Sequence, residues 1–243
     1  MHKVHIVHAH PEPRSFCTAM ARQAQSLFAQ QGCEVWFSDL YADGFDPVAK
    51  AGDFGARADP DYLVYALEQR HGYAHGTLAP DIQREVRRLL LCDTLVLVFP
   101  LYWFSVPAML KGWIDRCFLS GPLYGGKRIY GRAPMAGKRA VVAATLGGRE
   151  HMFGPDAVHG ELATGMLRHL LQGTLGYVGF DVLQPFFGWH VPYCTPDQRA
   201  QTMARWADYL QALDAQPRLP MPDLSRYDDL FRPLSAAATS TTE

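Results

Sequence analysis

Short apolar runs alternate along the chain with longer stretches in which apolar residues recur every three or four positions. The short runs have the length and the β-branched content of strands. They lie at residues 4–9, 34–40, 94–99, 139–145 and 180–183. The run TLVLVF at 94–99 is almost wholly apolar, as expected of a strand that is buried on both faces. The pattern predicts the α/β class, with a five-stranded parallel sheet and helices on both faces.

Helical periodicity fills most of the intervals between these strands. It is clearest in four stretches, at residues 16–31, 82–90, 107–117 and 196–213. Pro107 suits the first turn of its helix, because a backbone N–H has no intrahelical partner there. Thr195 and Gln198 have the spacing of a capping box and mark the start of the last helix.

Two segments depart from this alternation. Residues 44–79 form a long connection that is polar around GARADPD and helical only in part, and such a connection usually has a function or contacts a partner. Beyond about residue 213 the chain is rich in proline and ends in SAAATSTTE, which lacks the apolar residues to pack. We therefore expect one domain over 1–215 and a carboxyl-terminal extension over 216–243. The extension is expected to be partly disordered, with the disorder at its end.

Composition narrows the function without identifying it. The 243 residues include 23 basic and 24 acidic ones, so the chain has no excess of charge for binding nucleic acid or an anionic membrane. The five cysteines are spread out and form no C-x-x-C pair, which argues against a disulfide framework and a zinc site. His8 and His10 alternate on one strand, but without a third ligand nearby we expect no metal site. With no signal-type or membrane-spanning apolar segment, we expect a cytoplasmic protein.

The first predicted strand leads through a short polar loop, HPEPRSF, into a helix. In open α/β sheets, ligands bind where such loops meet helix amino termini. Ser15 suits the N-cap position, and its hydroxyl, the amides of Phe16, Cys17 and Thr18 and the ring of His10 can donate to anionic oxygens. These residues predict a phosphate cradle; the alternative is an ordinary capped helix with an exposed His10. The chain has neither G-x-G-x-x-G after this strand nor a P-loop motif, which argues against a classical dinucleotide domain.

The loop after the third predicted strand is rich in aromatic residues. Pro100 and Leu101 end the strand and are followed by Tyr102, Trp103 and Phe104. Exposing three aromatic side chains to water is costly, and a flat cofactor ring would cover them. The alternative is that they pack against a helix or a second subunit.

The fourth predicted strand ends at Thr145 and is followed by Gly147 and Gly148. Glycine lets the backbone approach a ligand closely, and the N–H groups can then donate to developing negative charge. A Gly-Gly turn is weak evidence taken singly. The place of this turn in the sheet makes it informative, because three loops suited to a ligand then follow three strands of one sheet.

A series of segments along the chain carries a resemblance to a known family. In order, they are HAHPEPRSF, SDLYADGFDP, GTLAPDI, FPLYWFSVPAMLKGW, and TLGG followed by VHGE. In these segments the chain resembles the NAD(P)H:quinone oxidoreductase (DT-diaphorase) family of flavodoxin-like flavoproteins. The resemblance covers roughly residues 4–193. It implies a flavodoxin-like fold and a homodimer with its sites at the interface, each binding a flavin, usually FAD. It further implies that NAD(P)H reduces this flavin and that a quinone or a similar flat aromatic acceptor then oxidises it in the same pocket, a ping-pong two-electron hydride transfer.

The resemblance also assigns roles to residues. The positions matching the family's cofactor-binding residues are His10, Ser15, Phe16, Cys17, Pro100, Leu101, Tyr102, Trp103, Phe104, Thr145, Gly147 and Gly148. The positions that match substrate-binding residues are Tyr124, Phe153 and His159. The catalytic role falls to His159 and to the backbone at Gly148.

This chain departs from the family pattern at three of these positions. Phe153 stands where the family has a tyrosine that forms a relay with the histidine at 159, and its ring has no hydroxyl. The remaining sources of positive potential are the amides around Gly148 and a protonated His159. Cys17 and Tyr102 replace amide side chains. Because Cys17 offers the phosphates no side-chain amide, FMN is possible beside FAD.

Three functions remain open at this point. The first is an enzyme, an NAD(P)H dehydrogenase (quinone). The second is a regulatory flavoprotein subunit of a potassium-efflux transporter, the one interpretation with a membrane partner. The third is a one-electron carrier, although flavodoxins are usually shorter and strongly acidic. The length, the long connection and the carboxyl-terminal extension favour the enzyme, whereas Phe153 slightly favours the regulator.

Overall fold

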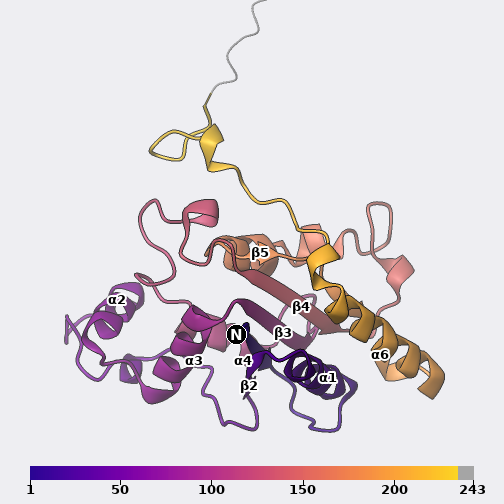
Figure 1. Cartoon of the computed structure of the whole chain (residues 1–243). Coiled ribbons are helices and arrows are strands. Elements are labelled where there is room, and N and C mark those ends of the chain that lie inside the picture. The colour runs from indigo at the N-terminus through magenta and orange to yellow at the C-terminus, as the bar shows by residue number, and fades with distance from the viewer. Residues whose placement is uncertain (235–243) are drawn as a thin grey trace, which may run out of the picture.

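A parallel sheet forms the centre of the protein in the computed structural model, which describes residues 1–234 (Figure 1). The strands lie in the spatial order β2-β1-β3-β4-β5, and β6 also pairs with β4. Their bounds are β1 Lys3–His8, β2 Glu34–Asp39, β3 Thr94–Pro100, β4 Arg139–Thr145, β5 Asp181–Val182 and β6 Phe186–Gly188. The predicted flavodoxin-like arrangement of parallel strands is confirmed. The disorder expected at the end of the chain falls on residues 235–243, outside the described residues.

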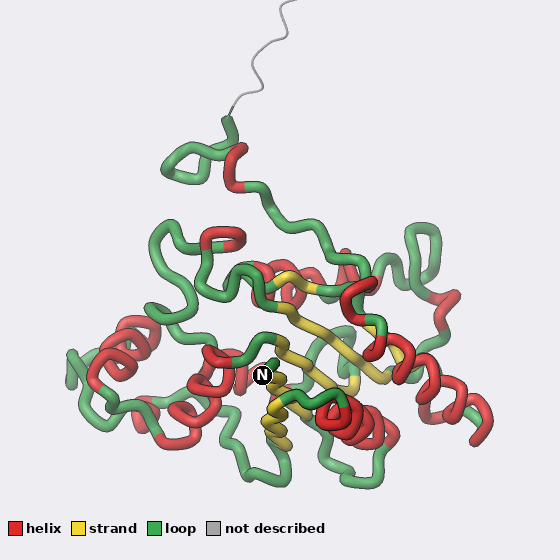
Figure 2. The backbone as a smooth tube through the Cα atoms, in the orientation of Figure 1, coloured by secondary structure: helices red, strands yellow, loops and turns green. Residues whose placement is uncertain are grey.

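Helices flank the sheet on both sides, as Figure 2 shows for the whole backbone. Their bounds are α1 Phe16–Gln30, α2 Tyr65–His75, α3 Pro80–Leu91, α4 Ala108–Cys117, α5 Arg168–Leu170 and α6 Pro196–Gln211. The predicted N-caps are confirmed, because the side chains of Ser15 and Thr195 accept from the amides of Thr18 and Gln198. Within residues 1–234, none of these helices combines the length and the apolar character needed to cross a membrane.

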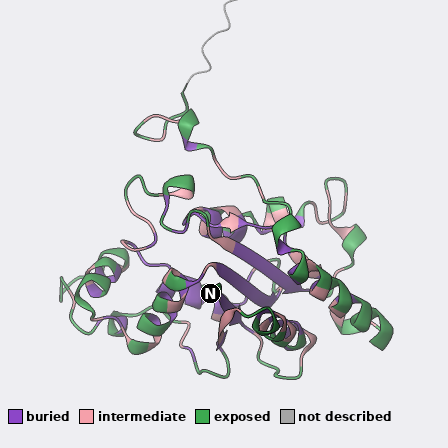
Figure 3. Cartoon of the chain, viewed as in Figure 1, coloured by how far each residue is buried: buried purple, intermediate pink, exposed green. Residues whose placement is uncertain are grey.

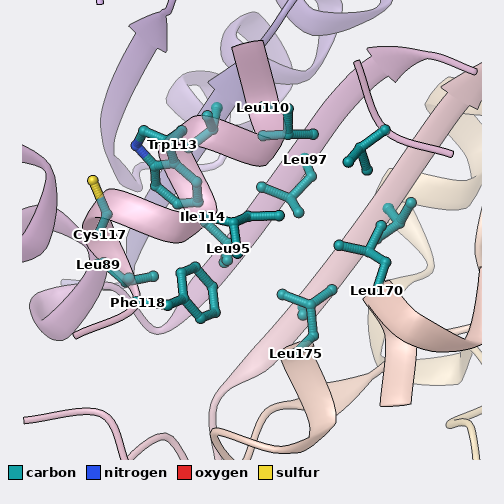
Figure 4. Close-up of a cluster of buried hydrophobic side chains, with 14 of the residues drawn as sticks. Leu89, Leu95, Leu97, Leu110, Trp113, Ile114, Cys117, Phe118, Leu170 and Leu175 are labelled. Atoms are coloured by element: carbon teal, nitrogen blue, oxygen red, sulfur yellow. The ribbon is translucent and has the colours of Figure 1, made fainter. Parts of the chain in front are cut away.

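Strand β3 lies at the centre of the sheet, and every one of its residues is buried (Figure 3). Leu95 and Leu97 belong to the core that α3 and α4 cover, whereas Val96 and Val98 belong to the core covered by α1 and α6. Figure 4 shows Leu95 and Leu97 beside Trp113 and other apolar side chains of α4. The apolar run therefore needs a helical layer on each face, as predicted.

The predicted fifth strand at 180–183 is confirmed as β5, and the structure adds a short strand, β6, that was not predicted. Both strands pair with β4. Asp181 pairs with Arg139 and Phe186 with Ala143, so the six residues 181–186 oppose the five residues 139–143. Pro185 lies between the two short strands and has no N–H to donate to a sheet.

A helical stretch over residues 162–176 was not among those predicted. It consists of α5 between two π-helical segments, Leu162–Met166 and Leu171–Gly176. The Leu167 amide donates to the Leu162 carbonyl at 2.8 Å, five residues back, and both leucine side chains are buried. The buried residues from Leu167 to Leu175 have ordinary helical spacing, and only the first interval, from Leu162 to Leu167, has the five-residue spacing of a π-helical turn.

The carboxyl-terminal segment first runs along the sheet edge and then leaves it. Leu219 donates its amide to the Val182 carbonyl, and Gln184 donates to the Pro217 carbonyl, both at 2.8 Å. Residues 223–234 then form a small lobe that projects from the domain (Figure 1). In the long connection over 44–79, α2 supplies the helical part that the sequence predicted.

A buried carboxylate joins α3 to α4. Glu85, which has no exposed surface, accepts from Trp113 Nε1 at 3.0 Å and from Arg84 and Arg88 at 3.0 and 3.1 Å. Burial acts to raise the pKa of Glu85, but the interaction of the carboxylate with His5, whose Nε2 lies 3.4 Å from Oε2, and its contacts with Ser38 and Arg84 outweigh burial and bring the pKa to about 2. Burial in turn lowers the pKa of His5 against the opposing effect of Glu85, so the two buried groups are coupled.

This carboxylate makes the stability of the fold dependent on acid. A carboxyl group whose pKa is lower in the folded chain than in the unfolded one stabilises the fold above the unfolded value of 4.5, and this effect is lost as the pH falls toward about 2. We expect Glu85→Gln to lower the free energy of unfolding by about 3 kcal/mol at pH 7 and by roughly half of that or less at pH 3. Urea unfolding at both pH values measures this difference. An equal loss at the two values would contradict the assignment.

Candidate active site

The loops that follow β1, β3 and β4 meet at one edge of the sheet and enclose a cavity of about 280 Å³. The predicted cofactor-binding residues that line it are His10, Ser15, Phe16, Cys17, Pro100, Leu101, Tyr102, Thr145 and Gly147. Larger hollows also occur. Two of them, of about 580 and 430 Å³, lie along α3, and no loop that follows a strand lines either one. Another, of about 360 Å³, lies beside Phe153 and Trp189 and contains none of the predicted cofactor-binding residues. The cavity at the strand ends is therefore the one where ligands of an open α/β sheet are expected.

A network of hydrogen bonds beneath the first loop holds it in place. The Thr18 amide donates to Ser15 Oγ at 3.0 Å, and the two hydroxyl oxygens lie 2.8 Å apart. His8, buried in β1, lies 3.0 Å from Thr18 Oγ1 through Nε2 and 3.1 Å from the Val98 carbonyl through Nδ1. Since the carbonyl can only accept, Nδ1 of this ring carries a proton, while the Thr18 hydroxyl donates to the Glu12 carbonyl at 3.0 Å. The Thr18 amide, which was expected to face anionic oxygens, is taken up by the N-cap instead. The N-cap of α1 is thus fixed from below by a strand residue.

His10 at the end of this strand presents a neutral hydrogen-bond donor. Its Nδ1 accepts from the Glu12 amide at 3.0 Å, so the proton of the neutral ring is on Nε2. Burial lowers the pKa of His10 below its ordinary value of 6.5, which keeps the ring uncharged at neutral pH. Cys17, also at the cavity, is buried, and this burial raises the pKa of its thiol to about 12. Neither side chain therefore adds a charge to the cavity.

The aromatic loop after β3 contains a tight turn of uncommon backbone geometry. Tyr102 and Ser105 exchange two backbone hydrogen bonds of 3.0 Å each, and the residues between them have φ values of +51° at Trp103 and +58° at Phe104. This left-handed region is typical of glycine or asparagine, and it costs a larger residue roughly 1–2 kcal/mol. Such strain persists only where the surroundings hold it. Trp103 is also 95% exposed.

The glycine loop after β4 is held through its carbonyl groups. The Leu146 carbonyl accepts from the Val191 amide at 3.0 Å, and the Gly147 carbonyl accepts from His190 Nδ1 at 2.9 Å. In a trans peptide the following N–H points the opposite way, so the amides of Gly147 and Gly148 point away from the 190–191 segment. Within residues 1–234, neither amide donates to a protein acceptor.

All three loops therefore present backbone donors with no internal partner. Phe16 and Cys17 begin α1, where an amide has no intrahelical acceptor. The turn amides of Trp103 and Phe104 also donate to no acceptor among the described residues. Phe16, Cys17 and Gly147 line the cavity, whereas the predicted cofactor-binding residues Trp103, Phe104 and Gly148 lie on the same loops outside its lining. These uncharged amide donors suit a ligand with phosphate and carbonyl oxygens.

The predicted substrate residues Phe153 and His159 lie beside the aromatic turn. The His159 ring centroid is 5.2 Å from that of Phe104 and 5.1 Å from that of Phe153. A methyl group placed on Gly148 would lie 2.9 Å from the Phe153 ring, so this ring also packs against the glycine loop. The structure brings these residues together, and it places a phenyl ring without a hydroxyl next to the histidine.

Tyr124 does not join them within one chain. Its ring packs against that of Tyr177, with the centroids 5.7 Å apart. Its assignment as a substrate residue stays a prediction.

The segment after β6 contributes to the site and was not predicted. Val191 and Pro192 line the cavity together with Leu146, and His190 orients the glycine loop. His190 itself has a φ of +55°. The only sequence signal was a proline just after an aromatic run, GWHVP, and it did not indicate that this segment returns to β4.

Comparisons with known proteins agree with this architecture. The family model described as "Flavodoxin-like fold" matches residues 2–213. NAD(P)H dehydrogenase [quinone] 1 of Cavia porcellus is 38% identical over 207 residues, which is 85% of this chain and 75% of that protein. Ribosyldihydronicotinamide dehydrogenase [quinone] of Mus musculus is 37% identical over 212 residues, 87% of this chain and 91% of that protein.

A solved structure extends the agreement to three dimensions. The crystal structure of a proposed quinone reductase from Klebsiella pneumoniae superposes with a TM-score of 0.88 at 33% identity, covering 93% of this chain and 91% of that one. Sequence and structure agree over nearly the whole described length, and the cavity lies at the edge where the sequence motifs placed it. The chain therefore belongs to the NAD(P)H:quinone oxidoreductase family of flavodoxin-like proteins.

Proposed function

We propose that this protein is a flavin-dependent NAD(P)H oxidoreductase that reduces quinones and similar flat aromatic acceptors. The observation that supports it most is the set of unpartnered amides from three loops around one cavity. The residues present fit a flavin. The amides of Phe16 and Cys17 suit its phosphate end, and those of Trp103 and Gly147 suit the polar edges of its ring. FAD is the proposed cofactor, with FMN as the alternative.

When bound, the flavin supplies the two-electron hydride chemistry, first with NAD(P)H and then with the acceptor. The protein positions the flavin and the acceptor and supplies positive electrostatic potential at the flavin ring. Uncharged amides near Gly148 stabilise negative charge at the ring edge, and a protonated His159 adds positive potential. The rings of Phe104 and Phe153, which meet edge to face with centroids 6.3 Å apart, form an aromatic wall of apolar surface for a flat acceptor.

We also propose that the protein works as a cytoplasmic homodimer. Residues beside and within α2 expose a group of apolar side chains, and the more exposed of them are Tyr62 at 70% and Leu67 at 55%. A cluster of this kind is typical of an interface. The five cysteines are all unpaired, which suits a reducing compartment. A transporter-regulating role has no support among the named relatives, which are dehydrogenases.

A spectroscopic titration tests the proposed function. Purified protein reconstituted with FAD should show flavin absorption that bleaches with anaerobic NADPH and returns with benzoquinone. Chromatography of the released cofactor distinguishes FAD from FMN. Flavin that binds but is bleached by neither NADPH nor NADH would favour a regulatory role, and a protein that binds no flavin would refute the cofactor assignment.

The glycine loop allows a matched pair of variants. Gly147→Pro removes an amide that has no internal acceptor, so the fold should persist while quinone turnover falls by about 10- to 100-fold. Gly147→Ala keeps the amide, and its methyl group would meet nothing closer than Tyr193 at 3.9 Å, so it should lose far less activity. Steady-state kinetics with circular dichroism as a folding control measures both. Equal turnover in the two variants would contradict a role for this amide.

A further inference from the structure

The turn at Trp103 and Phe104 has little of its own side-chain packing to hold its backbone. Both residues have positive φ, and neither is a residue type that favours it. Trp103 is 95% exposed, and Tyr102 and Phe104 are 45% and 39% exposed. Something beyond the three aromatic side chains must therefore select this conformation.

Ser105 connects the turn to a distant helical stretch. Its amide closes the turn on the Tyr102 carbonyl at 3.0 Å, and its Oγ lies 3.1 Å from Nε2 of His169, which is 64 positions further along the chain. His169 belongs to α5, between the two π-helical segments. The hydroxyl thus joins the last residue of the strained turn to a separate element.

The orientation of His169 is fixed by its own neighbours. Its Nδ1 lies 3.0 Å from the Met166 carbonyl, so Nδ1 carries a proton and donates. In the neutral ring Nε2 then has the free lone pair, and it accepts the Ser105 hydroxyl proton. Thr174 Oγ1 donates to the His169 carbonyl at 3.0 Å and fixes the backbone of the same residue.

The π-helical turn accounts for the placement of His169. A π-turn contains one more residue than an α-turn, so every later residue is rotated by about 100° around the axis relative to a regular helix. Leu162 and Leu167, five residues apart, both face the core, and His169 lies on the exposed side. If the stretch were a regular α-helix starting from the same Leu162, Arg168 would occupy the place that His169 has now. The arginine side chain has no acceptor for the Ser105 hydroxyl.

We infer that His169 is a positioning residue that acts through Ser105 to hold the turn at Trp103 and Phe104, and with it the aromatic wall beside the cavity. The expected effect on catalysis rests on the proposed function, because it assumes that the turn amides and the Phe104 ring face the flavin and the acceptor. The hydrogen-bonded link itself does not depend on that function. It can therefore be tested with and without turnover.

Fluorine NMR of protein that contains 5-fluorotryptophan gives the structural test. The Trp103 resonance is assigned with Trp103→Phe, and it is then compared in Ser105→Ala, His169→Ala and the double variant. We expect the same shift or broadening of this resonance in each single variant and no further change in the double one, because both substitutions remove one interaction. His169→Gln, whose side-chain amide can both donate and accept, should restore much of the original signal.

Thr164→Val is the matched control, because it removes a hydrogen bond of the same helical stretch, from Thr164 Oγ1 to Glu161 at 3.2 Å, and leaves the Ser105–His169 pair in place. It should leave the Trp103 resonance and turnover unchanged. In the flavin-loaded enzyme, Ser105→Ala and His169→Ala should each lower kcat for a quinone by about threefold to tenfold, with a smaller change in KM for NADPH.

Two results would overturn the inference. One is a Trp103 resonance that both single variants leave unchanged, and the other is a pair of changes that add in the double variant. If His169→Ala fails to fold, Ser105→Ala alone still decides through the same resonance. A protein that reduces no quinone but shows the non-additive NMR changes would refute the proposed function and leave the positioning role intact.

Discussion

The structure depends above all on the burial of β3 from both sides. Each of its residues lies in the core, and successive side chains belong to two different apolar clusters. Such a strand is stable only with a helical layer on each face, and parallel neighbours then place all their carboxyl ends at one edge. The loops after β1, β3 and β4 meet there for this reason, and the cavity between them is a consequence of the core.

The site that results is built from main-chain groups more than from charged side chains. Its donors are helix-terminal, turn and glycine amides, and the ionisable residues that line the cavity, His10, Cys17 and Tyr102, are kept neutral by burial, which lowers the pKa of the histidine and raises those of the other two. Fixed uncharged dipoles can stabilise negative charge that develops during a reaction without first having to reorganise. Such a site depends on accurate backbone positions, which is why strained segments such as the turn at Trp103 need external support.

The sequence predicted most of what periodicity and capping chemistry can reveal. Strands β1 to β4 and the N-caps at Ser15 and Thr195 follow from local patterns, and so does the gathering of the strand-end loops. Local patterns did not reveal the break between β5 and β6, because it depends on a pairing between distant residues. They also missed the π-helical stretch, in which Leu162 and Leu167 are five residues apart, and the return of Val191 to the cavity. The role assigned to Tyr124 came from the resemblance alone, and within the described chain its ring packs against Tyr177.

Diffraction from crystals grown with FAD is the most direct test of the central claim, that the three strand-end loops form a flavin site. We predict electron density for the isoalloxazine ring in the cavity, within hydrogen-bonding distance of the amides of Trp103, Phe104, Gly147 and Gly148. Density for the phosphates should lie at the start of α1. Flavin density in the hollows along α3, with the strand-end cavity filled only by water, would contradict this claim.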